Sequence, residues 1–105
     1  MDQIPAKIRK IIDKYINELE RNKIFIRQAV LFGSHCRGLS HEWSDIDIAL
    51  VSDAFEGIRI RDRGKIRHIT LSISSDLSPL PYKPEDFTLE DPFVREIIEN
   101  GVRIV

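Results

Sequence analysis

The chain has 105 residues, enough for one small domain with a single hydrophobic core. Its apolar content of 42% and charged content of 31% are typical of a globular protein, and its net charge of −1 gives no overall basic footprint for nucleic acid. No apolar run approaches the roughly 20 residues of a membrane span, and the N-terminus has no signal-peptide core. A single cysteine, Cys36, excludes an internal disulfide. We therefore expect a cytoplasmic protein, and not a processive polymerase.

The first third of the sequence predicts a helix followed by a strand. Residues 4–22 place apolar side chains at helical spacing with lysines off that stripe, and Pro5 suits a first helical turn. The apolar stripe comprises Ile4, Ile8, Ile11, Ile12, Tyr15, Ile16 and Leu19. Residues 24–32 are then expected to form a strand, and residues 34–39 a loop or short helix. A second strand is expected over residues 46–51, buried on both faces because it is almost continuously apolar.

Residues 58–75 are ambiguous. Arginine or lysine recurs at every second position from Arg59 to Arg67, which indicates a strand, yet Ile66, Ile69 and Ile73 would share one face of a helix. We favour a helix over about 61–73. The basic run itself usually forms a solvated face, but it can also receive an acidic partner or RNA.

The last third predicts a strand, a turn, a helix and a short strand. Residues 76–82 are expected to form a strand, and its two prolines, Pro79 and Pro81, suit the edge of a sheet. Residues 84–87 form a turn or a single helical turn. Asp91 is a suitable N-cap for a helix over 93–100, Gly101 closes that helix, and residues 102–105 follow as a strand. The fold class is therefore α/β (α+β), with a small mixed β-sheet flanked by helices.

The segment from Leu31 to Val51 carries the strongest functional signal. Gly33-Ser34 follows an apolar strand, and glycine lets the backbone approach a ligand while free N–H groups at a helix start attract phosphate. Asp45 and Asp47 are two residues apart, so on a strand they point to the same side. Two like charges beside a buried sheet are costly unless a cation neutralises them. The pattern therefore indicates Mg²⁺ held between the protein and a nucleoside triphosphate.

Such a site suits nucleotidyl transfer. Asp45 and Asp47 would hold two metal ions, Gly33 and Ser34 would bind the β- and γ-phosphates, and Arg37 would pair with a phosphate. A third carboxylate is usually needed as metal ligand or general base. Asp76 is the candidate because it begins the expected third strand, and Asp53 is the fallback.

Other residues near the motif give weaker signals. His35, Cys36 and His41 match no standard zinc spacing and lack a fourth ligand. Cys36 has no evident partner base for nucleophilic chemistry. Trp43 can stack on a base, although packing is the more ordinary role.

Together, Gly33-Ser34 and Asp45-x-Asp47 on a strand resemble the signature of the DNA polymerase beta-like nucleotidyltransferase superfamily. The chain is similar to a minimal nucleotidyltransferase (MNT) domain over residues 1–105, and the interval between the motifs resembles that of antitoxins paired with HEPN toxins. This resemblance implies Mg²⁺, ATP and transfer of AMP to a tyrosine hydroxyl of a HEPN toxin. It implies that Gly33 and Ser34 bind the triphosphate and that Asp45, Asp47 and Asp76 hold the metals. Asp76 departs from the family pattern, because Leu-Ser-Pro-Leu-Pro follows it.

Two alternatives remain open. One is a catalytically silent module that binds nucleotide or neutralises a partner by contact. The other is a small-molecule nucleotidyltransferase of the aminoglycoside-modifying kind, which would need a further domain or a dimer to form an acceptor pocket. Because 105 residues include no evident acceptor-binding domain, we expect a homo- or hetero-oligomer.

Overall fold

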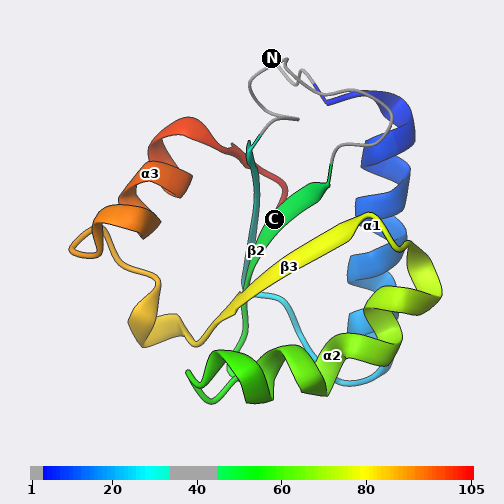
Figure 1. The fold of residues 1–105 in the computed structure, drawn as a ribbon, viewed down its shortest axis with the longest axis horizontal. Coiled ribbons are helices and arrows are strands. Elements are labelled where there is room, and N and C mark those ends of the chain that lie inside the picture. Colours follow the sequence, from blue (N-terminus) through cyan, green and yellow to red (C-terminus); the bar gives the residue numbers. More distant parts are fainter. Residues whose placement is uncertain (1–3, 34–44) are drawn as a thin grey trace.

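The computed structural model describes residues 4–33 and 45–105. Within them, a four-stranded mixed sheet has the strand order β3-β2-β1-β4. Helices α1 and α2 cover one face of this sheet and α3 covers the other (Figure 1). The expected fold class is thus confirmed. None of the helices in this part of the chain has the length and hydropathy of a membrane span.

Helix α1 (Ala6–Arg21) forms where the apolar stripe predicted it. The chain leaves this helix through Lys23, which has a positive φ of 66°, and the Ile24 N–H bonds back to the Leu19 carbonyl at 2.9 Å. Strand β1 (Gln28–Phe32) consequently begins four residues later than expected. Ile24 and Ile26 are still buried, because this connection packs into the core instead of pairing with a strand.

The central strand of the functional segment is β2 (Ile46–Val51), as predicted. It pairs antiparallel with β1, with Phe32 opposite Asp47. It pairs parallel with β3 (Leu77–Tyr82), with Asp47 opposite Ser78. Strand β4 (Val102–Arg103) adds to the other side of β1 and is shorter than expected.

Residues 59–73 form helix α2 (Arg59–Ile73), which settles the ambiguity of this segment in favour of a helix. Ile66 and Ile69 are buried on one face, whereas the alternating basic residues point mainly to solvent. Near its start, Asp62 is fully buried and accepts hydrogen bonds from the N–H groups of Glu56 (2.8 Å) and Gly57 (2.9 Å). Tertiary burial, and not the period of the charges, decides the structure here.

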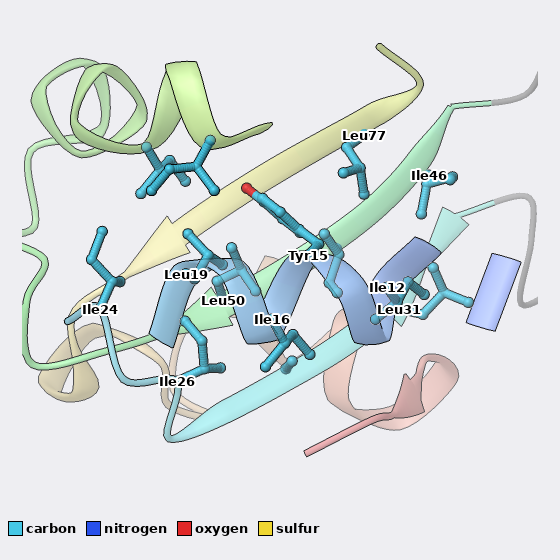
Figure 2. Close-up of a cluster of buried hydrophobic side chains, with 14 of the residues drawn as sticks. Ile12, Tyr15, Ile16, Leu19, Ile24, Ile26, Leu31, Ile46, Leu50 and Leu77 are labelled. Atoms are coloured by element: carbon cyan, nitrogen blue, oxygen red, sulfur yellow. The ribbon is translucent and has the colours of Figure 1, made fainter. Parts of the chain in front are cut away.

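The main core lies between the sheet and the two helices α1 and α2. Figure 2 shows Tyr15 of α1 with its hydroxyl directed toward α2, where it lies 2.6 Å from Thr70 Oγ1. The surrounding buried side chains are aliphatic: Ile12, Ile16, Leu19, Ile24, Ile26, Leu31, Ile46, Ile48, Leu50, Ile66, Ile69 and Leu77. This layer fixes one face of β2, so that the alternate side chains of β2 face α3.

The C-terminal part follows the prediction closely. A single 3₁₀ turn, η2 (Pro84–Asp86), precedes α3 (Pro92–Asn100). Asp91 Oδ1 caps α3 by accepting from the Phe93 N–H at 2.9 Å and the Val94 N–H at 3.4 Å. Gly101 ends the helix without a positive φ, and a Cβ there would lie 2.6 Å from Val30 Cγ1. Glycine is thus needed for close packing on β1, not for a left-handed cap.

Strand β3 lies at the edge of the sheet, as its two prolines predicted. The carbonyls of Asp76 and Tyr82 accept hydrogen bonds from the β2 side, from Ile46 and Ser52. Because backbone direction alternates along a strand, the even-numbered residues of β3 face β2, and Pro79 and Pro81 point their ring nitrogens toward the open edge. The outer edge of β3 therefore lacks two of the donors that another strand would use.

Candidate functional site

The two carboxylates of the motif lie at the start of β2. Asp45 is exposed immediately before the strand, and Asp47 is half-buried as its second residue. Ile46 between them is buried in the core shared with α1. Because alternate residues of a strand point to opposite faces, Asp45 and Asp47 are directed to the α3 side of the sheet. The structure thus places both on the same face, as the sequence predicted, and shows that this face is the one away from the α1 layer.

Gly33 lies directly against Asp47. Its φ is +79°, in the left-handed region that favours glycine, and the preceding residue, Phe32, is the β1 partner of Asp47. A Cβ on Gly33 would overlap the Asp47 carboxylate and lie 3.2 Å from its Cγ. The motif's glycine and its second aspartate, fourteen residues apart in sequence, therefore form one unit, and the absence of a side chain at residue 33 leaves room for the Asp47 carboxylate.

Asp76 lies beside the first carboxylate through the parallel pairing of β3 with β2. Its carbonyl accepts from the Ile46 N–H at 2.8 Å, and the pairing of Ile46 with Leu77 continues to place Asp76 next to Asp45. Across residues 4–33 and 45–105, however, no three acidic, histidine or cysteine side chains gather closely enough to hold a metal. The role of Asp76 as third carboxylate therefore stays a prediction.

Asp53, the fallback, lies past the opposite end of β2. Its carboxylate is bound to Arg27 at 3.1 Å, and its side chain is 75% exposed. It is thus separated from Asp47 by most of the strand. Ser34 and Arg37, together with His35, Cys36, His41 and Trp43, lie outside the described residues, so the expectations for them stay predictions.

Two neighbours of Asp47 were missed by reasoning from the sequence. Phe32 and Ser78 pair with Asp47 from the adjacent strands and share its face of the sheet. The Phe32 ring meets the half-exposed ring of Phe93 from α3 edge to face, with centroids 6.2 Å apart. Only the strand register brings these residues together. In the sequence, Ser78 was the one polar side chain within the apolar first half of β3, which was the signal available for its position on the face of Asp47.

The oxygen donors present fit Mg²⁺. This ion prefers oxygen ligands, keeps several waters and is commonly bound by one or two carboxylates plus substrate phosphates. Asp45 and Asp47 supply the two carboxylates on one face, and Gly33, which has no side chain, leaves room for the Asp47 carboxylate. The residues that would hold the metal are therefore Asp45 and Asp47, with the remaining ligands expected from a nucleotide and water.

The small sheet, the paired carboxylates and the glycine turn carry the motif whose resemblance to nucleotidyltransferases the sequence showed. The family model for the nucleotidyltransferase domain matches residues 12–105. The chain therefore belongs to the nucleotidyltransferase domain family, within the polymerase beta-like superfamily that its motif resembles.

A solved structure supports the same fold. A candidate nucleotidyltransferase from Sulfolobus solfataricus superposes with a TM-score of 0.63 at 17% sequence identity, covering 92% of this chain and 78% of the other. At this identity the similarity shows the fold alone. Comparison with curated proteins gives no match.

Proposed function

We propose that the protein is a Mg²⁺-dependent nucleotidyltransferase that moves AMP from ATP to a hydroxyl of a partner protein. The observation that carries this proposal is the contact of Gly33 with Asp47 beside Asp45 on the exposed end of β2. Membership of the nucleotidyltransferase domain family supports the reaction class. The nucleotide, the metal and a tyrosine of a HEPN toxin as acceptor rest on the resemblance of the motif.

In this reaction an acceptor oxygen forms a bond to the α-phosphorus, and the bond from that phosphorus to the bridging oxygen of the β-phosphate breaks. Pyrophosphate leaves, and the acceptor proton passes to a base. Bound Mg²⁺ neutralises the triphosphate and the charge that develops during transfer. Asp45 and Asp47 would hold the metal, Gly33 and Ser34 would bind the phosphates, and Arg37 would pair with one of them. Asp76, beside Asp45, is the candidate to accept the proton at its carboxylate.

The test combines binding with transfer. Calorimetric titration of ATP with Mg²⁺ should show metal-dependent binding that the double variant Asp45→Asn/Asp47→Asn loses. The matched control is Asp53→Asn, which makes the same chemical change at the far end of β2 and should bind normally. Transfer is then followed with ATP labelled at the α-phosphate and a HEPN-type protein encoded beside this chain. Label on that protein, lost in the double variant only, supports the proposal, and equal labelling by all variants refutes it.

A silent binding module is the second candidate function, because three metal-binding side chains do not converge in the described residues. The two candidates differ in one measurement. If Asp45→Asn/Asp47→Asn neutralises the partner as well as the wild-type chain, contact alone is the function. If neutralisation is lost while the variant still binds the partner, transfer is the function.

A further inference from the structure

We propose that the groove between α2 and β3 is a docking site for an acidic amphipathic helix of a partner protein. The groove has a volume of about 600 Å³ and lies on the face of the sheet opposite to the Asp45 and Asp47 carboxylates. It is thus separate from the candidate transfer site. The proposal concerns binding alone and does not depend on the proposed reaction.

Basic side chains form one wall of the groove. Arg59, Arg63 and Arg67 are four residues apart and so lie along one side of α2, and all three line the groove. Like charges at this spacing destabilise a helix in the free chain. Carboxylates of an acidic partner would offset that repulsion, so the row of arginines indicates a surface that binds an acidic partner.

Among the residues that the structure describes, the charges of Arg59, Arg63 and Arg67 are largely uncompensated. The nearby carboxylate of Glu56 pairs instead with Arg61 at 3.6 Å and with Lys65 at 3.5 Å, and neither of these two residues lines the groove. Arg59 lies over the Tyr82 ring, 5.5 Å from its centroid. No carboxylate among the described residues pairs with Arg63 or Arg67, although both are exposed. Carboxylates of an incoming partner are the complementary groups.

Apolar side chains form the rest of the groove. Leu77 and Pro79 of β3 line it from the sheet, and two residues of α2 that also line it are unusually exposed, Ile60 at 82% and Leu71 at 56%. Arginine mixed with apolar surface is typical of protein interfaces. None of the described residues that line the groove is aromatic, so they offer no stacking platform of the kind that single-strand RNA-binding proteins use. The observations therefore favour a protein partner.

Two features favour a helix as the occupant. The prolines of β3 remove donors from the open edge, which disfavours addition of a strand to the sheet. Gly64 lies in the middle of α2 and lines the groove, and a Cβ there would meet nothing within 4 Å. Glycine at this position weakens the helix by about 1 kcal/mol relative to alanine. Its open space allows a partner helix to approach α2 closely.

The helices that the structure describes do not favour a second copy of the chain as the occupant. Of the α-helices that the structure describes, α3 is the one in which acidic residues outnumber basic ones, and its Glu96 and Glu99 are exposed. Its apolar residues Val94 and Ile97 are already buried against the sheet. The described residues of a second copy thus offer no free acidic amphipathic helix, which favours a different protein as the partner.

The test uses a synthetic, fluorescein-labelled 16-residue peptide with leucines on one helical face and glutamates four residues apart on its flank. We expect saturable binding to the purified chain, measured by the fluorescence anisotropy of the peptide. In NMR spectra of the chain, the amide chemical-shift changes should be confined to α2 and β3. Reversing both free charges, Arg63→Glu/Arg67→Glu, should weaken binding about tenfold or more. The matched control, Lys10→Glu/Lys14→Glu, reverses two charges on α1 outside the groove. It should change the dissociation constant of the peptide by less than about twofold.

A second variant fills the groove without changing charge. Gly64→Leu projects into open space, so the chain should fold and lose peptide binding, while Gly64→Ala should bind nearly normally. Equal losses in the arginine and lysine variants, full binding by Gly64→Leu, or shifts outside α2 and β3 would overturn the proposal. Tighter binding of oligouridylate than of the peptide in the same groove would assign it to RNA instead. Self-association that competes with the peptide would assign it to a second copy.

Discussion

Replacing Gly33 by alanine should damage the candidate site far more than the fold. The new methyl group would occupy the space of the Asp47 carboxylate, within 3.2 Å of Cγ and 3.4 Å of Cβ. Asp47 is held in β2 by pairing on both sides, with Phe32 and with Ser78. Its side chain must therefore rotate away from its present position, because the strand itself cannot move without breaking the sheet.

The energetic cost has two parts. Alanine at a φ of +79° costs about 1–2 kcal/mol in the free energy of unfolding. Displacement of the carboxylate affects mainly the ligand, since a misplacement of about 1 Å in a catalytic group can lower the rate about 100-fold. We therefore expect a modest loss of stability and a loss of about tenfold or more in metal-dependent ATP binding, because disturbing the residues that orient a metal ligand typically lowers metal affinity about 10- to 100-fold.

Gly57→Ala is the matched control. Gly57 also has a positive φ, +91°, so alanine there carries a similar conformational cost. Its Cβ would meet the Lys83 Cε at 2.9 Å and Asp86 Oδ2 at 3.0 Å, at the ends of side chains that can move. Urea denaturation should show similar destabilisation of both variants, and calorimetry should show a binding loss for Gly33→Ala alone. Equal ATP affinity in the two variants would refute the role assigned to the contact between Gly33 and Asp47.

Three further predictions concern stability. Burial raises the pKa of Tyr15 to about 12, so the stability that its neutral hydroxyl contributes should be complete below about pH 10 and fall by about 2–3 kcal/mol as the pH rises to 12. In urea denaturation, the unfolding free energies of the wild type and Tyr15→Phe should converge over that range. Asp62→Ala should lower the free energy of unfolding by about 3 kcal/mol, because the N–H groups of Glu56 and Gly57 lose their acceptor. Asp62→Asn should have an intermediate effect, and an unchanged urea midpoint for Asp62→Ala would contradict this prediction. Asp91→Ala should lower the free energy of unfolding by about 1 kcal/mol because α3 loses its N-cap. In thermal unfolding followed by circular dichroism, the control Glu90→Ala, at the exposed neighbouring residue, should show no measurable loss.

Local patterns in the sequence determined most of the secondary structure. The apolar stripe of α1, the continuous apolar run of β2 and the Asp91-Pro92 start of α3 each reflect a few neighbouring residues, so the structure confirms them. The prolines of β3 likewise predicted an edge, because a residue without an N–H cannot pair on that side. The motif from Gly33 to Asp47 predicted the nucleotidyltransferase family for the same local reason.

Tertiary structure alone decided the contacts between distant residues. The register of β1 on β2 brings Gly33 against Asp47, and the parallel pairing of β3 brings Asp76 beside Asp45. The late start of β1 and the helical state of residues 59–73 depended on which side chains the core could bury. The groove is formed by residues of α2 and β3, which only the packing of the helix beside that strand brings together. Such features arise from long-range packing, whose free energy no single segment contains.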